Sequence, residues 1–193
     1  RIAPTLDMTV GAEDLVEEAK ARLDAYGAIF DRAEQARDLK DDLDAALDET
    51  RTAVGGKGNA LILLVSGTKI SAYGAGSRFG WLHDRLDLPQ AVPDLREGNH
   101  GEAVSFEFLA KADPDWLLVI DRGAAIGQGA AIGQGGEAAA ATLDNPLVAG
   151  TRAGKAGQIL YLDGAAMYLA AGGVQSLMLT LEQLRQSFAD AGA

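Results

Sequence analysis

The chain has 193 residues, of which 48% are hydrophobic, and its formal net charge at pH 7 is −11. This acidity argues against nucleic acid and against an anionic membrane surface as partners, because both require clustered Lys and Arg. The sequence contains no cysteine, which excludes disulfides, thiolate metal sites and cysteine nucleophiles. No apolar run reaches the roughly 18–20 residues that a membrane-spanning helix needs.

Two helices come first in the predicted order of elements. Residues 12–27 carry apolar side chains at helical spacing, with acidic residues in the first turn and Gly27 at the end. Residues 33–54 carry a second apolar stripe that stops at Gly55. A single stripe with charged flanks fits a helix that joins two lobes, and it fits an ordinary amphipathic core helix equally well.

Strands and helices alternate after residue 58. The expected strands share short apolar runs and lie at 59–67, 69–74, 116–122 and 158–164. The expected helices lie at 77–86, 106–112, 137–143 and 174–188. Strands separated by single helices predict a mostly parallel sheet in a three-layer α/β/α sandwich.

A glycine-rich stretch, GAAIGQGAAIGQGG, occupies residues 123–136 and contains a tandem copy of AAIGQG. It includes a G-x-G-x-x-A pattern formed by Gly133, Gly135 and Ala138, which is typical of nucleotide-binding loops. The pattern begins twelve residues after Asp121, where the preceding strand is expected to end. In a nucleotide-binding loop, the first glycine instead turns the chain directly out of the strand, and the helix N-terminus then contacts the phosphates. We therefore expect a flexible surface loop rather than a phosphate cradle.

Four side chains lie just past strands or in loops that we expect on one edge of the sheet: Arg78, His100, Arg122 and Tyr168. Two guanidinium groups neutralise a polyanion, and imidazole and phenolate are ligands for Fe(III). Each residue also has an ordinary interpretation. An Arg after a strand pairs with a local carboxylate such as Asp121, a His in a glycine-rich loop is exposed, and a Tyr in an apolar stretch caps a core.

Several motifs occur in a fixed order: SRFG, HG-x-x-V-S-x-E, PD-x-L-x-V-I-D-R and LDN. Together they resemble the substrate-binding proteins of bacterial ABC importers for ferric siderophores, in the enterobactin/petrobactin-type, catecholate-binding branch. The resemblance covers residues 59–187 well and the preceding helices more loosely.

This resemblance implies two α/β lobes joined by one long helix, the class III arrangement of substrate-binding proteins. Residues 1–27 are then the tail of an N-terminal lobe that is largely absent, with RIAPTL as the end of a strand. Residues 28–57 are the linking helix, and residues 58–193 are the C-terminal α/β lobe.

The resemblance also assigns roles to residues. Arg78 and Arg122 face the catecholate oxygens, whereas His100 and Tyr168 complete the coordination of the siderophore's Fe(III). Glu107 docks onto arginines of the membrane permease, although an acid in the first turn of a helix has an ordinary role in stabilising it.

The leading hypothesis is therefore a periplasmic or membrane-tethered extracytoplasmic receptor. It binds a ferric siderophore as its ligand, has no permanently bound cofactor and no catalytic group, and delivers the ligand to an ABC permease in the inner membrane. Two alternatives stay open: a nucleotide-binding α/β enzyme that uses the glycine loop, and a truncated chain that has no ligand and self-associates as a dimer.

Overall fold

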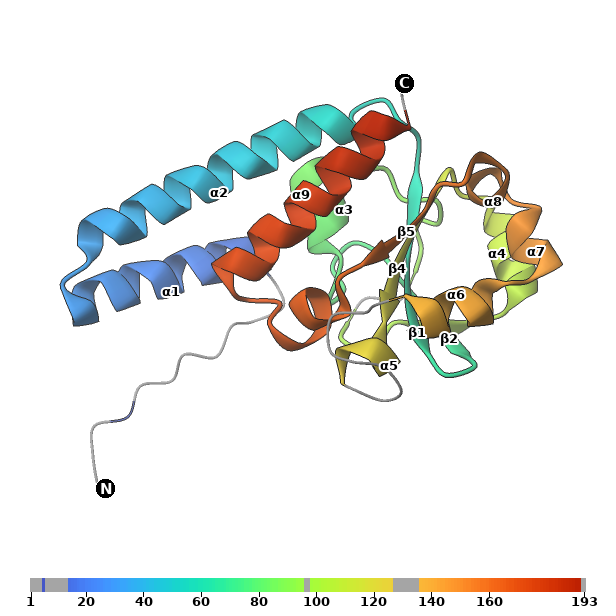
Figure 1. Cartoon of the computed structure of the whole chain (residues 1–193), viewed down its shortest axis with the longest axis horizontal. Coiled ribbons are helices and arrows are strands. Elements are labelled where there is room, and N and C mark those ends of the chain that lie inside the picture. The colour runs from blue at the N-terminus through green and yellow to red at the C-terminus, as the bar shows by residue number, and fades with distance from the viewer. Residues whose placement is uncertain (1–4, 6–13, 96–97, 127–135, 192–193) are drawn as a thin grey trace.

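A computed structural model describes residue 5 and residues 14–95, 98–126 and 136–191. Its centre is a five-stranded sheet with helices on both faces, in the strand order β3-β2-β1-β4-β5 (Figure 1). The strands are β1 (Ala60–Ser66), β2 (Lys69–Tyr73), β3 (Glu102–Val104), β4 (Trp116–Asp121) and β5 (Ile159–Leu162).

The sheet is mixed, so the expected mostly parallel sheet is wrong in this respect. The β1–β4 and β4–β5 pairs are parallel, whereas the β1–β2 and β2–β3 pairs are antiparallel. The cause is the connection between β1 and β2, in which Ser66 pairs with Lys69 across a two-residue turn. So short a connection permits only antiparallel pairing, and Gly67 adopts the positive φ of 57° that the turn requires.

One face of the sheet is covered by α1 (Leu15–Phe30), α2 (Ala33–Val54), α3 (Trp81–Leu86) and α9 (Val174–Asp190). The long helix α2 lies beside α9, and the α1–α2 pair extends away from the sheet (Figure 1). Apolar side chains of α2 and α9, such as Leu43 and Leu184, are fully buried here. The ring of Phe188 stacks on that of Trp116, with 3.8 Å between centroids, which anchors α9 to β4.

The opposite face is covered by α4 (Phe106–Ala112), α6 (Glu137–Leu143), α7 (Pro146–Ala149) and α8 (Arg152–Ala156). Alternate residues of the central strands serve the two cores: Leu117 and Val119 belong to this one, whereas Leu118 and Ile120 belong to the other. Burial on both faces explains why β4 reads as a continuous apolar run. The three-layer α/β/α sandwich is thus confirmed.

Helix α1 does not end at Gly27, as the sequence predicts, but continues to Phe30 and stops at Asp31 in the left-handed conformation. Gly27 is buried where α1 meets α2, and a Cβ atom there would lie 2.8 Å from the Cβ of Ala36. The glycine therefore permits close packing of two helices instead of terminating one.

Several predictions fall partly or wholly outside the described residues. These are the strand end at residues 1–6, apart from Thr5, and the greater part of the glycine loop, including Gly133 and Gly135. The described flanks of the loop are α5 (Arg122–Ala125) and α6. Within the described ranges, no helix is both long enough and apolar enough to cross a membrane.

Candidate functional site

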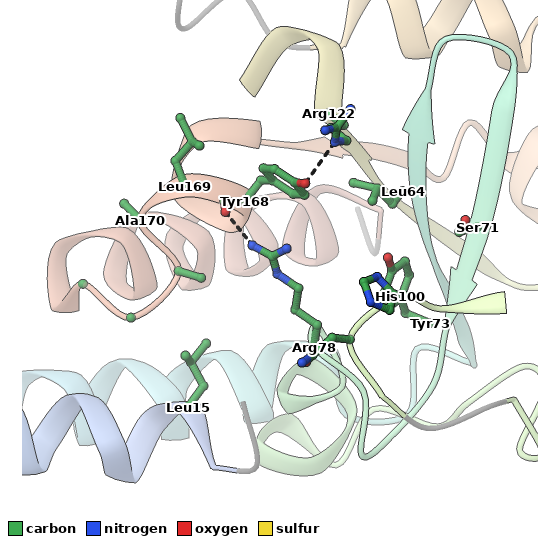
Figure 2. Close-up of a pocket in the computed structure, with 14 residues that line it drawn as sticks. Leu15, Leu64, Ser71, Tyr73, Arg78, His100, Arg122, Tyr168, Leu169 and Ala170 are labelled. Carbon is green, nitrogen blue, oxygen red and sulfur yellow. Dashed lines mark hydrogen bonds between the residues drawn. The ribbon is translucent and has the colours of Figure 1, made fainter. Parts of the chain in front are cut away.

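A pocket of about 1080 Å³ lies near the ends of β1 and β4. All four predicted ligand-binding residues, Arg78, His100, Arg122 and Tyr168, line it (Figure 2). They come from four separate connections, namely the β2–α3 loop, the loop before β3, the start of α5, and the one-turn π-helix η1 (Ala165–Leu169). The remaining walls are largely apolar and include Leu15, Leu64 and Leu169.

Arg122 is the first residue of α5, and its half-buried guanidinium reaches the pocket rather than its neighbour Asp121. The Nε atom donates to the hydroxyl oxygen of Tyr168 at 2.9 Å, and Nη1 donates to Oγ of Ser66 at 3.4 Å. The local Asp–Arg pair that we weighed as the ordinary interpretation is therefore not what Arg122 forms.

The carboxylate of Asp121 is occupied by the backbone. It is only 3% exposed, and its two oxygens accept the N–H groups of Ala124 at 3.0 Å and Ala139 at 2.9 Å. One carboxylate thus ties the end of β4 to the starts of both α5 and α6. This capping is what directs the chain at Arg122 towards the pocket.

Arg78 approaches the same tyrosine from the other side. Its Nη2 atom donates to the backbone carbonyl of Tyr168 at 2.6 Å, and its Cζ atom lies 4.3 Å from the centroid of the Tyr168 ring. The loop that carries Arg78 is held by a hydrogen bond from its backbone N–H to the carbonyl of Gly98, at 3.4 Å.

Tyr168 consequently lies between two cations. The hydrogen bond from Arg122 lowers the pKa of the Tyr168 hydroxyl; partial burial opposes this, and the positive charges of Arg122 and Arg78 reinforce it. A lower pKa makes the phenolate, which is the form that binds hard cations, easier to reach.

His100 is exposed and lines the pocket across from Tyr168 (Figure 2). Its position depends on Gly101, which has a φ of 65°. A Cβ atom on Gly101 would lie 2.7 Å from the ring of Tyr73 and 2.8 Å from the carbonyl oxygen of Ala72. Glycine is therefore required for this loop to lie against β2.

Glu107 lies outside the pocket, in the first turn of α4. Ser105 caps this helix by accepting the N–H of Phe108 at 3.3 Å, and a hydrogen bond with Ser105 lowers the pKa of Glu107. The side chain is exposed and acidic, and it occupies the ordinary position of an acid at a helix N-terminus.

Sequence reasoning missed Ser66 and Tyr73, and it missed the part played by the Tyr168 backbone carbonyl. Ser66 is the last residue of β1, so the rule that ligands lie beyond the ends of parallel strands was a usable signal for it. Tyr73 ends the antiparallel strand β2 and carried no comparable signal.

The model of the periplasmic binding protein family matches residues 1–166. The petrobactin-binding protein YclQ of Bacillus subtilis (strain 168) is 33% identical over 186 residues, which cover 96% of this chain and 56% of the relative. The ferric-anguibactin-binding protein FatB of Vibrio anguillarum is 26% identical over 193 residues, which cover 97% of this chain and 58% of the relative.

Solved structures agree with these matches. The crystal structure of YclQ has a TM-score of 0.88 at 30% identity and covers 97% of this chain and 64% of that one. The periplasmic catecholate-siderophore binding protein VctP of Vibrio cholerae has a TM-score of 0.84 at 28% identity, covering 96% of this chain and 65% of that one. The chain therefore spans less than two thirds of the length of these relatives.

Proposed function

Since this chain belongs to the periplasmic binding protein family, we propose that it captures an anionic Fe(III)–catecholate complex in the pocket between Arg78 and Arg122. The family match confirms the resemblance carried by the ordered motifs. The relatives named for binding petrobactin, ferric anguibactin and catecholate siderophores support this class of ligand.

The observation that carries the proposal is the pair of guanidinium groups without a carboxylate. Within the described residues, neither Arg78 nor Arg122 lies within ion-pair distance of an acidic side chain, although the chain as a whole has a net charge of −11. Cations left unpaired in a half-enclosed pocket of an acidic protein favour a multiply charged anion, because they supply both charge and directed N–H donors.

Tyr168 and His100 add two side chains that can coordinate the iron of the ligand. A phenolate oxygen and an imidazole nitrogen fill positions on Fe(III) that a siderophore leaves open. The lowered pKa of Tyr168 supports the first of these roles. Iron arrives and leaves as part of the ligand, so the function requires neither a catalytic group nor a permanent cofactor.

The family also supports proposals for the location of the protein, its docking partner and its division into lobes. We place the protein in the periplasm, or tethered outside the cytoplasmic membrane, and assign the exposed Glu107 to docking on the arginines of an ABC permease. In the same proposal, residues 1–27 belong to an N-terminal lobe, residues 28–57 are the linking helix, and residues 58–193 form the C-terminal lobe.

Fluorescence titration tests ligand binding. Trp81 and Trp116 provide the signal, and a tris-catecholate complex of Fe(III) is the probe. We expect quenching at micromolar ligand and about a tenfold or larger loss of affinity in Arg78→Ala and in Arg122→Ala, because each removes charge-assisted hydrogen bonds.

Arg152→Ala is the matched control, since Arg152 lies on α8, across the sheet from α9, and pairs with Asp113 and Asp115. Its affinity should equal that of the wild type. The proposal fails if the wild type gives no response at micromolar ligand, or if both pocket variants bind as the wild type does.

The matched relatives are named for binding siderophores, which supports the receptor over the nucleotide-dependent enzyme. Gly133 and Gly135 lie outside the described residues. Self-association of the chain stays a prediction. Light scattering at high protein concentration tests it.

A further inference from the structure

One residue, Tyr168, contacts both pocket arginines through three different groups. Its hydroxyl oxygen accepts from Arg122, its backbone carbonyl accepts from Arg78, and the two guanidinium carbons lie 5.5 and 4.3 Å from its ring centroid. From this geometry we infer that Tyr168 is the positioning residue of the pocket, which holds both arginines in their binding arrangement before the ligand arrives. The inference deepens the proposed function and rests on it.

The two guanidinium groups need such a support because they carry like charges. A carboxylate between them would hold them but would also cancel the charge that attracts an anion. A neutral phenol ring offers a different solution: its face attracts cations, its hydroxyl and the backbone carbonyl accept hydrogen bonds, and the net positive charge remains.

The contacts to Tyr168 leave both arginines competent to bind. A guanidinium has donors on three nitrogens, and Arg122 uses Nε towards Tyr168 and one donor of Nη1 towards Ser66. Arg78 donates from Nη2 to the carbonyl, and a hydrogen bond with the Tyr168 side chain contributes to the lowered pKa of the tyrosine. Among the described residues, these contacts use a minority of the N–H groups of the pair, and both side chains reach Tyr168 from opposite sides (Figure 2).

Tyr168 is itself held in place by the turn η1. Met167, beside it, is 2% exposed in the core, and Asp163 caps the turn by accepting the N–H of Ala166 at 2.7 Å. At the start of the turn, a Cβ atom on Gly164 would lie 2.6 Å from the carbonyl oxygen of Asp121. This close approach fixes η1 against the end of β4, where Arg122 begins.

Positioning and iron ligation are separable by the choice of metal. Chromium(III) tris-catecholate has the same charge and shape as its iron counterpart, but it is inert to substitution, and all its metal positions are filled by catechol oxygens. A tyrosine that acts only as an iron ligand cannot affect its binding. A tyrosine that positions the arginines affects the binding of both complexes.

The experiment measures the affinity of chromium(III) tris-catecholate for the wild type, Tyr168→Phe and Tyr161→Phe. We expect about a tenfold loss in Tyr168→Phe, because the hydrogen bond that sets the orientation of Arg122 is absent. Tyr161→Phe is the matched control: Tyr161 lies on β5, packs against the core on the opposite face of the sheet, and lies outside the described lining of the pocket. Its affinity should be unchanged.

A double-mutant cycle identifies the route of the effect. In an Arg122→Ala background, Tyr168→Phe should cause less than a twofold further loss, because the group it positions is already gone. Losses that multiply instead would overturn the inference, since Tyr168 would then act independently of Arg122.

Thermal unfolding of each variant separates positioning from a loss of folding. If Tyr168→Phe does not fold, Tyr168→Met replaces it; Met lacks both the ring and the hydroxyl, and we expect it to lose at least as much affinity. Wild-type affinity for the chromium complex in a folded Tyr168 variant overturns the inference while the proposed function stands. Failure of the wild type to bind either metal complex overturns the proposed function itself.

Discussion

The carboxylate of Asp121 is the structural support of the pocket that a single substitution tests most directly. It is 3% exposed and accepts one backbone N–H from α5 and one from α6. Asp121→Asn keeps the size of the side chain and converts one of the two accepting oxygens into an NH₂ donor. That donor then faces a backbone N–H, so one hydrogen bond is lost and a buried N–H group is left without an acceptor.

The expected cost follows from these two changes. A hydrogen bond to a charged acceptor contributes about 1.5–3 kcal/mol, and an unsatisfied buried polar group costs about 1–3 kcal/mol. Because these two energies partly count the same lost hydrogen bond, they do not add in full. We expect a loss of roughly 2–4 kcal/mol in the free energy of unfolding. This is a large share of the total stability of a domain, which is about 5–15 kcal/mol.

Urea denaturation measures this loss. With a slope of about 2–3 kcal/mol per M, the midpoint should fall by about 1 M. The affinity for Fe(III) tris-catecholate should fall as well, since Arg122 directly follows the disturbed cap. Asp94→Asn, at an exposed loop position, should change neither quantity. A midpoint that moves by less than about 0.3 M at constant slope would refute the assignment of Asp121 as the support of this corner.

Three further predictions concern other parts of the chain. Burial lowers the pKa of His83 below its ordinary 6.5, despite an opposing backbone hydrogen bond, so the unfolded chain takes up the proton first. Stability should therefore fall as the pH drops from about 7 to about 5, and His83→Asn should flatten that part of the urea-midpoint profile. Gly101→Ala should cost more stability and ligand affinity than Gly98→Ala, because both sites have positive φ but only the first would clash, with the ring of Tyr73. Glu107→Lys should leave affinity for the ferric complex intact and reduce uptake by permease-containing vesicles; equal uptake would count against the docking role.

The sequence predicts the central strands and long helices well because their burial is periodic or complete. Strands β1 and β4 read as continuous apolar runs, since both of their faces are buried. Helix α9 places Leu177, Leu181 and Leu184 on one face, and the structure buries all three.

Short elements were not predicted because they owe their shape to neighbours rather than to their own residues. Strand β3 has three residues and exists only through pairing with β2. The π-helix η1 depends on the close approach of Gly164 to the end of β4, which no local pattern encodes. Gly27 was misread for the same reason: in a sequence, a glycine that ends a helix and a glycine that lets another helix approach look identical.

The rule for the carboxyl ends of parallel strands accounts for only two of the four predicted pocket residues. Arg122 and Tyr168 follow the parallel strands β4 and β5, so the rule for the carboxyl ends of such strands places them together. Arg78 and His100 belong to connections of the antiparallel strands, to which the rule does not apply. They reach the pocket because the isolated bridge between Ser77 and Gly98 brings their two loops side by side.

The acidic surface of the chain and the two pocket arginines together favour a compact anion over an extended one. Charges on the surface are screened over about 8–10 Å at physiological ionic strength, so the net charge of −11 acts weakly on an anion that is already within the pocket. There Arg78 and Arg122 act at contact distance with their donors oriented by Tyr168. The acidic exterior thus disfavours extended polyanions such as nucleic acids, which contact a broad surface. A compact anion that fits between the two arginines meets mainly their positive charge.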